Sequence, residues 1–264
     1  MNMPASANVF LVTHKCGNNY IESVFKNDET LLTCQSDDLK GEMPGPYVGE
    51  VSGIEKDFVN IRCRNFDPLS IERLLRHIDI NSSRFYMLTR HPASFFRSAA
   101  SYHLRFASSP RERWAKTNKY SCLGGKTLSE AIVSAGTEEE RLRVSMKFFG
   151  LAWNLLDRWV LNYRFLVSLG VDFRVVKAED LFQDGSESFF SSLAEFMSHG
   201  SYQIAKERLK EASPLYMEKL PRHSTGEFRK DPFSGYGQNA LGMYYDHFYD
   251  HQNFFYSGNG MHLL

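Results

Sequence analysis

Four short runs of apolar and β-branched residues constrain the fold of this chain more than any other feature. They span residues 8–13, 58–63, 84–89 and 173–177. Each run is almost continuously apolar, which is typical of strands in a parallel sheet that is covered on both faces. Helical patterns separate the runs, at residues 19–25, 69–77 and 92–104. This alternation predicts an α/β fold with a central, mostly parallel sheet flanked by helices.

The middle of the chain, from about residue 111 to 170, is mostly helical in its pattern. Residues 138–169 carry aromatic and aliphatic side chains at helical spacing, so we expect one long helix whose apolar stripe belongs to the core. Thr127 precedes another helical pattern and predicts an N-cap. Further helices are expected at 187–197 and 202–212. Because no repeat or linker is visible, residues 1–264 are predicted to form a single domain.

The charge balance limits the partners of the protein. The 264 residues contain 31 Lys and Arg and 31 Asp and Glu, so the formal net charge is zero. This argues against a broad surface for nucleic acid, although it allows a local basic site.

No stretch approaches the ~20 apolar residues that span a bilayer. Four cysteines lie far apart in the sequence, at Cys16, Cys34, Cys63 and Cys122. Their spacing favours reduced thiols and a cytoplasmic protein.

The first segment whose residues suggest a binding or catalytic function covers residues 9–25. It reads as a strand, a polar turn that contains Lys15 and Gly17, and a helix. Such a turn presents backbone N–H groups that favour a phosphate, and Gly17 allows the backbone to approach the anion closely. Lys15 would add a mobile positive charge, and Asn18 and Asn19 would add side-chain donors. The pattern GxxxxGK[ST] is absent, so an ordinary ATP or GTP loop is excluded.

The second segment covers residues 84–103. A predicted strand ends at Arg90, and Pro92 follows at a position that the first turn of a helix tolerates. Ser98 lies one or two turns into that helix. An arginine fork and a hydroxyl group together suit a second phosphate.

Together the two segments resemble the sulfotransferases that use 3′-phosphoadenosine 5′-phosphosulfate (PAPS). In that family a motif of the form PKSGTTW holds the 5′-phosphosulfate, and a later motif, in essence RxPxxxxxS, holds the 3′-phosphate. Residues 13–20 match the first motif with Lys15, Cys16 and Gly17, while Asn18 and Asn19 replace hydroxyl donors. Tyr20 stands at the aromatic position that stacks near the adenine. The second motif is matched at the family spacing by Arg90, Pro92 and Ser98.

Two later segments resemble the same family in the same order. Residues 173–181 are similar to the family's strand that ends in YEDL, with Ala178 in place of the tyrosine. Residues 222–230 resemble the late RKGxxGDW loop, which closes over the 3′-phosphate. The resemblance places four residues of this loop at the cofactor: Arg222, Ser224, Thr225 and Gly226.

The resemblance implies an enzyme that moves a sulfuryl group from PAPS to a hydroxyl or amine of a small molecule or carbohydrate. It assigns Lys15 to the leaving phosphate and requires no metal. The general base stays open among His14, Asp37, Asp38, Glu50 and Asp67, all near expected strand ends, and we select His14 and Asp67 as the catalytic candidates beside Lys15. Two alternatives are a nucleotide-dependent, kinase-like enzyme and a catalytically inactive homologue that only binds a nucleotide.

Two other patterns are assigned to structure rather than to a site. His247 and His251 have a spacing that could hold zinc, but a surface helix is the preferred interpretation. The run 124–127 (Gly-Gly-Lys-Thr) lacks a preceding apolar strand, and we expect a turn that leads into the Thr127 cap.

Overall fold

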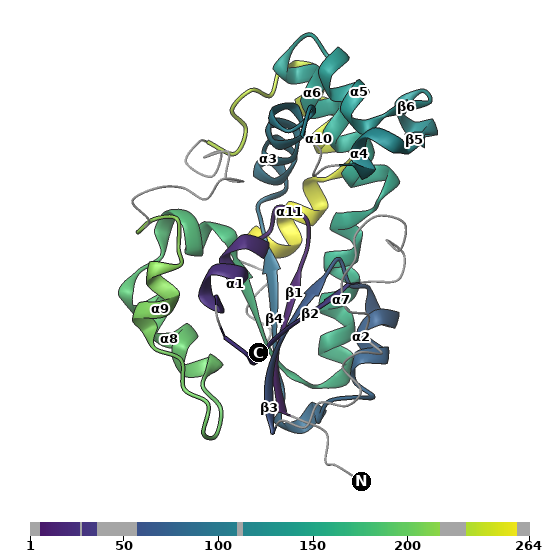
Figure 1. The fold of residues 1–264 in the computed structure, drawn as a ribbon. Coiled ribbons are helices and arrows are strands. Elements are labelled where there is room, and N and C mark those ends of the chain that lie inside the picture. The colour runs from purple at the N-terminus through teal and green to yellow at the C-terminus, as the bar shows by residue number, and fades with distance from the viewer. Residues whose placement is uncertain (1–5, 27, 36–56, 110–112, 217–230, 258–264) are drawn as a thin grey trace. The chain divides into compact units, whose positions relative to one another are not determined.

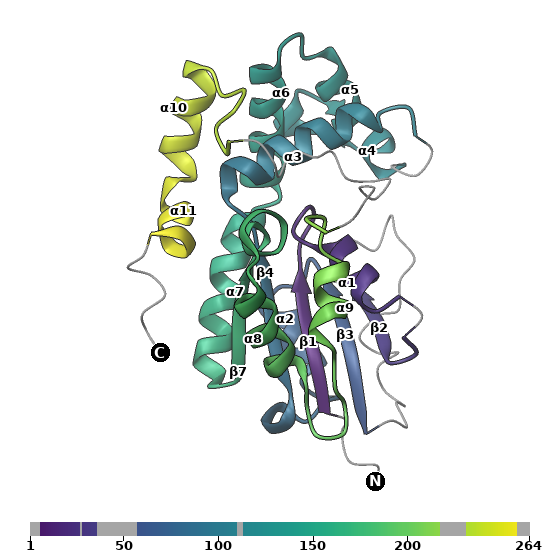
Figure 2. The same cartoon turned by 90° about the vertical axis from the view of Figure 1, so that its left-hand side faces the viewer.

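A five-stranded parallel sheet organises the computed structural model, which describes residues 6–26, 28–35, 57–109, 113–216 and 231–257 (Figures 1 and 2). The strand order is β2-β3-β1-β4-β7, and every neighbouring pair is parallel. The strands are β1 (Ser6–Val12), β2 (Leu31–Gln35), β3 (Phe58–Arg64), β4 (Arg84–Thr89) and β7 (Asp172–Lys177). The predicted α/β class is confirmed, as are the four predicted strands.

The chain divides into two compact units, each built from two stretches of sequence. The sheet unit comprises Met1–Thr89 and Leu161–Pro221, and the helical unit comprises Arg90–Val160 and Arg222–Leu264. The expectation of one domain over residues 1–264 stays a prediction.

Helices cover both faces of the sheet within the sheet unit. They are α1 (Asn18–Val24), α2 (Pro68–Leu74), α8 (Glu187–Met197), α9 (Lys206–Glu211) and the part of α7 (Leu155–Leu169) that follows Val160. Figure 1 shows α1, α8 and α9 on one face and α2 and α7 on the other. Two short helical turns, η3 (Ile80–Ser82) and η7 (Asp180–Asp184), complete this unit.

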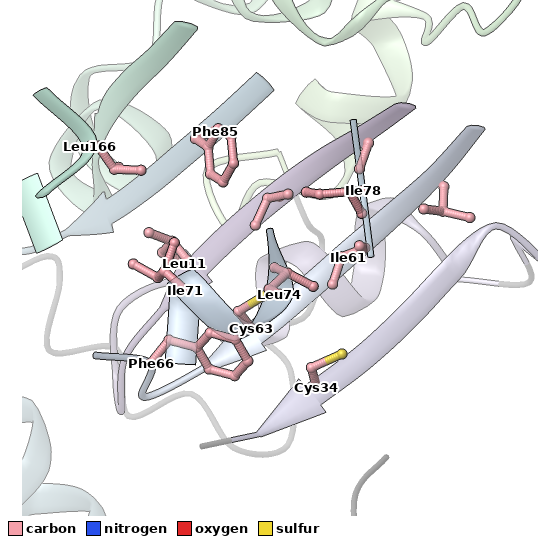
Figure 3. Close-up of a cluster of buried hydrophobic side chains, with 13 residues drawn as sticks. Leu11, Cys34, Ile61, Cys63, Phe66, Ile71, Leu74, Ile78, Phe85 and Leu166 are labelled. Atoms are coloured by element: carbon pink, nitrogen blue, oxygen red, sulfur yellow. The ribbon is translucent and has the colours of Figure 1, made fainter. Parts of the chain in front are cut away.

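The face toward α2 and α7 is an apolar core (Figure 3). Side chains on a strand alternate between the two faces, so every second residue of β1 up to Leu11 enters this core. Leu74 from α2 and Leu166 from α7 pack against them. Cys34 and Cys63 lie in the same core, directly paired in the register of β2 and β3. Burial raises the pKa of the Cys63 thiol, and the neighbouring Cys34 adds to this effect.

The opposite face combines aromatic packing with buried amides. Phe10 lies 5.3 Å from Phe25 and 4.7 Å from Tyr86, between ring centroids. Asn8 is fully buried, and its side-chain amide donates to Asn60 Oδ1 at 3.1 Å and to the Met197 carbonyl at 2.9 Å. These bonds satisfy a polar group that would otherwise be costly to bury, and they attach the end of α8 to the sheet.

The helical unit contains helices and one small hairpin. Its elements are α3 (Pro92–Arg105), α4 (Trp114–Thr117), β5 (Lys119–Tyr120), η5 (Ser121–Leu123), β6 (Lys126–Thr127), α5 (Leu128–Ser134), α6 (Glu138–Ser145), η6 (Met146–Ala152), the part of α7 up to Val160, α10 (Gln238–His247) and α11 (Tyr249–Tyr256). None of the helices described in either unit has both the length and the apolar composition needed to cross a membrane.

The expectation of one helix over residues 138–169 is wrong. Helix α6 passes into the π-helical turn η6 and the chain then breaks at Asn154, whose φ is 49°, before α7 begins. Asparagine tolerates this left-handed conformation, which a continuous right-handed helix cannot include. The expected core role of the stripe is confirmed, because Phe148, Phe149 and Trp159 are at most 1% exposed.

Thr127 is the N-cap of α5, as predicted. Its hydroxyl accepts a hydrogen bond from the Glu130 backbone N–H, and Glu130 accepts one from the Thr127 N–H. This reciprocal pair is a capping box. The glycines of the run 124–127 form the turn before it, with Gly124 and Gly125 both at positive φ.

Candidate functional site

The carboxyl ends of β1 and β4 mark the place where an α/β sheet of this topology binds ligands. The two strands are parallel neighbours at the centre of the sheet. The chain leaves β1 toward β2 at one edge and leaves β4 toward β7 at the other. Open α/β sheets bind ligands at such a switch point, outside the carboxyl ends of the strands. Both predicted phosphate-binding segments begin here, since the Lys15 loop follows β1 and Arg90 follows β4.

The loop between β1 and α1 has an unusual backbone. Lys15 adopts a φ of 62° and Gly17 a φ of 82°, and the Cys16 N–H closes a turn to the Thr13 carbonyl at 3.1 Å. A positive φ is uncommon at a residue with a side chain and tends to occur at functional sites. Left-handed residues within a turn also direct successive N–H groups inward, which creates a concavity for an anion.

Gly17 allows this loop to lie against β4. A Cβ atom added at Gly17 would stand 2.4 Å from Leu88 Cδ2, a distance that real Cβ atoms do not reach. Leu88 is the penultimate residue of β4, two residues before Arg90. Glycine therefore meets two requirements here, a positive φ and close contact between the loop and the end of the neighbouring strand.

Asn65 holds the start of the loop, and the sequence analysis missed it. This residue follows β3, has a φ of 54° and is 8% exposed. Its backbone N–H donates to the Val12 carbonyl at 2.8 Å, and its side-chain Oδ1 accepts from the His14 N–H at 3.1 Å. One residue thus fixes the chain on both sides of Thr13. The available signal was an asparagine two residues after the run predicted as a strand at 58–63, since asparagine tolerates left-handed turns.

The predicted residues of the loop differ in their exposure. His14, Lys15, Asn18 and Asn19 are partly exposed, whereas Cys16 is fully buried, so Cys16 can offer only backbone groups to a ligand. Asn18 and Asn19 form the first turn of α1. Among the described residues, no hydrogen-bond partner faces the buried Asn18 Oδ1 atom, and the same is true of Thr89 Oγ1 at the end of β4.

Tyr20 is directed into the protein. It is 5% exposed, its hydroxyl donates to the Leu209 carbonyl at 3.0 Å, and its ring meets the edge of Phe182. Burial raises the pKa of the phenol well above its ordinary value. This packing connects α1 to α9 and leaves little ring surface for an adenine.

The second predicted segment opens the helical unit. Arg90 is the first residue after β4 and is 5% exposed, and Pro92 occupies the first turn of α3 as expected. Ser98 lies within α3 and is also 5% exposed. The structure therefore gathers the loop residues in the sheet unit, whereas Arg90 and Ser98 belong to the helical unit. Ala178, which stands where the family has a tyrosine, is buried directly after β7.

Asp67 has a structural function. Its carboxylate accepts a hydrogen bond from the Ser70 N–H at 2.7 Å and so caps α2, ahead of Pro68. The other acidic candidates for a base, Asp37, Asp38 and Glu50, lie outside the described residues. So do the predicted cofactor residues Arg222, Ser224, Thr225 and Gly226.

His247 and His251 do not share one helix. Phe248 separates α10 from α11, and His251 Nε2 lies 2.7 Å from Asp157 Oδ1. Within the described part of the chain, no three His, Cys, Asp or Glu side chains gather as a metal site would require. All four cysteines are free thiols, and Cys122 alone among them is exposed.

Comparison of the sequence with models of known protein families gives no match, and a search among curated proteins gives none either.

Proposed function

We propose that this protein is a sulfotransferase that uses PAPS as its sulfuryl donor. One observation carries the proposal: two neighbouring parallel strands are each followed by a segment of a kind that binds phosphate. A loop with left-handed residues at Lys15 and Gly17 follows β1, and Arg90 directly follows β4. The motif resemblance in the sequence supports the same assignment in the same order.

The residues that follow β1 and β4 have side-chain and backbone groups of the kind that bind a nucleotide with several negative charges. The loop offers backbone N–H groups together with the Lys15 ammonium, and Arg90 offers a planar fork of donors that matches a phosphate. One buried polar atom at the end of β4, Thr89 Oγ1, has no hydrogen-bond partner within the described residues. A hydroxyl such as that of Thr89 can donate to a phosphate oxygen.

The roles of the residues follow from their chemistry. PAPS supplies an activated sulfuryl group, so no metal is needed to generate one. Lys15 would stabilise the negative charge that develops on the leaving phosphate, and Arg90 would hold the second phosphate in one orientation. His14 precedes Lys15 and is our candidate for accepting the proton of the acceptor hydroxyl. The acceptor is proposed to be a hydroxylated small molecule or a carbohydrate.

One observation favours a second candidate, a homologue that binds the nucleotide without transferring sulfate. The carboxylate of Asp67 is engaged in the cap of α2. A carboxylate oxygen that accepts the Ser70 N–H at a helix cap is already engaged and is less available to a substrate hydroxyl. Catalysis would then depend on His14 or on an acidic residue outside the described part of the chain.

The test combines ligand binding with sulfate transfer. A saturating amount of 3′-phosphoadenosine 5′-phosphate, about 100 times its Kd, should raise Tm by about 5 °C, and ATP should not. Transfer of labelled sulfate from PAPS to a panel of phenols, alcohols and sugars then separates the enzyme from the inactive homologue. Stabilisation by ATP alone would favour the kinase-like alternative and refute the proposal.

Substitution of Lys15 gives the sharper form of the test. Lys15→Ala should reduce the transfer rate about 100-fold or more, as loss of a group that stabilises developing charge does. Lys26→Ala is the matched control, because Lys26 is an exposed lysine just after α1. Equal activity of the two variants would contradict the role of Lys15.

A further inference from the structure

A cavity of about 350 Å³ that is open to solvent is formed by residues of the helical unit. Three segments line it: the turn from η5 to β6, the second half of α5, and one face of α6 and η6. Figure 1 labels α5, α6 and β6, which carry most of this lining. Small-molecule sites typically measure ~300–1,000 Å³, so the cavity suits a molecule with one or two rings.

The charged side chains of the lining are mainly positive. Lys126 comes from β6, Arg143 from α6 and Lys147 from η6. Arg143 and Lys147 are four residues apart on one continuous helical stretch, a spacing that places them on the same face. Glu140 is the one acidic residue that the described lining contains. Three cations therefore face a single carboxylate.

That carboxylate is already engaged. Glu140 Oε2 accepts the Thr137 N–H at 3.0 Å and completes the capping box of α6. Lys126 Nζ donates to Ser134 Oγ at 3.2 Å. Among the described residues, no hydrogen-bond or salt-bridge partner is found for the side chains of Arg143 and Lys147, although Arg143 interacts electrostatically with Glu140 and Lys147 with Cys122. The N–H donors of both side chains are consequently available to an anion.

Apart from the Ser134 hydroxyl, the remaining side chains of the lining are apolar. Leu123 and Ala131 are largely buried, at 8% and 6% exposed, and Val144 lies between the two cations in the sequence. A ligand gains hydrophobic free energy when it covers these apolar side chains and removes them from water. The combination of an apolar wall with two available cations matches a molecule that has an apolar ring and an acidic group.

We infer that this cavity binds a small organic anion, namely a carboxylate, a sulfonate or a sulfate monoester attached to an aromatic or aliphatic ring. The acidic group contacts Arg143 and Lys147, and the ring covers Leu123 and Ala131. The site does not depend on the proposed sulfotransferase activity, because the residues of the β1 loop and of the RxPxxxxxS motif take no part in it.

Cys122 supplies a reporter at the rim of the cavity. It is the exposed member of the four cysteines, and it belongs to the lining. The whole protein is treated with the neutral reagent 4,4′-dithiodipyridine, and the rate of thiol modification is followed with and without naphthalene-1-sulfonate. Cys122→Ser should abolish the reaction and so show that the signal comes from this thiol.

The expected result is that naphthalene-1-sulfonate slows the modification of Cys122 in a saturable way. In the double variant Arg143→Gln/Lys147→Gln, the half-protecting concentration should rise about tenfold. The variant Arg76→Gln/Lys26→Gln, with two exposed charges removed from the sheet unit, should behave as the wild type. Both double variants change exposed side chains, and an unchanged Tm verifies that each is folded.

Three results would overturn the inference. The first is the absence of protection by naphthalene-1-sulfonate at millimolar concentration. The second is equal protection by the neutral analogue 1-naphthalenemethanol, which would mean an apolar pocket without anion selectivity. The third is equal protection by inorganic sulfate, which would mean that the apolar wall contributes nothing.

Discussion

Leu88 occupies the space that a Cβ atom on residue 17 would need, and residue 17 is glycine. Leu88 Cδ2 lies 2.4 Å from the position that a Cβ on Gly17 would take. The loop after β1 and the end of β4 therefore touch at Gly17, where any Cβ atom would require the Leu88 side chain to move. This contact fixes the loop that carries Lys15 relative to the strand that leads to Arg90.

Gly17→Ala should lower both stability and nucleotide binding. Alanine at a φ of 82° is strained by roughly 1–2 kcal/mol, and the clash with Leu88 adds roughly 1–3 kcal/mol of overpacking. Urea unfolding measures the sum. Gly124→Ala is the matched control, because Gly124 has a φ of 66° but open space around its Cβ position. If the two variants lose equal stability, the contact with Leu88 is unimportant.

Asn65→Gly should weaken the loop without introducing strain. Glycine accepts the φ of 54°, but the His14 N–H loses its acceptor, which costs roughly 1–3 kcal/mol when the group stays buried. We expect lower stability and about tenfold weaker binding of 3′-phosphoadenosine 5′-phosphate, measured by calorimetry. Asn65→Asp keeps an oxygen acceptor and should retain most of both. If the Asn65→Gly variant binds as tightly as the wild type, the hydrogen bond from the His14 N–H to Asn65 is not needed for binding.

Asp67 can be tested as a cap and as a base with one pair of variants. Asp67→Ala should cost about 1 kcal/mol of stability, because the Ser70 N–H loses its partner. Asp67→Asn keeps an acceptor oxygen but cannot accept a proton at neutral pH. From the capping geometry we expect Asp67→Asn to retain both stability and sulfate transfer. Loss of transfer at unchanged Tm would instead assign Asp67 to catalysis.

Asp28 should make the stability of the sheet unit depend on pH. Burial acts to raise the pKa of Asp28, but hydrogen bonds from Thr30 and the Arg208 guanidinium outweigh it and hold the pKa below its usual value. A lowered pKa means that this carboxylate stabilises the fold above the unfolded value of about 3.9. Its contribution is therefore complete at neutral pH and is lost as the pH falls through the folded pKa.

The variant Asp28→Asn isolates this effect. Its stability should be lower than that of the wild type at pH 7, and the difference should shrink below a pH of about 4. Chemical unfolding at both pH values gives the comparison. A difference that stays constant with pH would show that the charge of Asp28 contributes nothing.

The parts of the fold that could be predicted are those with a strong local signal. The apolar run at residues 84–89 coincides with β4, and Pro92 marks the start of α3 as expected. Strand β2 was missed because its sequence, LLTCQ, is short and ends in polar residues. As an edge strand with a single neighbour, β3, it needs less apolar surface than a central one.

A site residue could be predicted from the sequence only where its own chemistry, without knowledge of its neighbours in space, is enough to suggest its role. Lys15 and Gly17 could be selected because a phosphate loop needs a cation and a residue with conformational freedom. Asn65 could not be selected, since its function depends on the register that pairs β3 with β1. The same limit applies to Asp67, where a carboxylate after a strand is compatible with a base and with a cap until its partner, the Ser70 N–H, is known.

The order of the strands along the chain has a consequence for synthesis on the ribosome. Strand β4 pairs with β1 on one side and with β7 on the other, and the first stretch of the helical unit lies between β4 and β7 in the sequence. One edge of β4 therefore stays unpaired until Asp172 and the residues after it have been translated. Exposed strand edges are sites of aggregation. Slow translation between Arg90 and Val160 would prolong this exposure, and we expect it to lower the yield of folded protein.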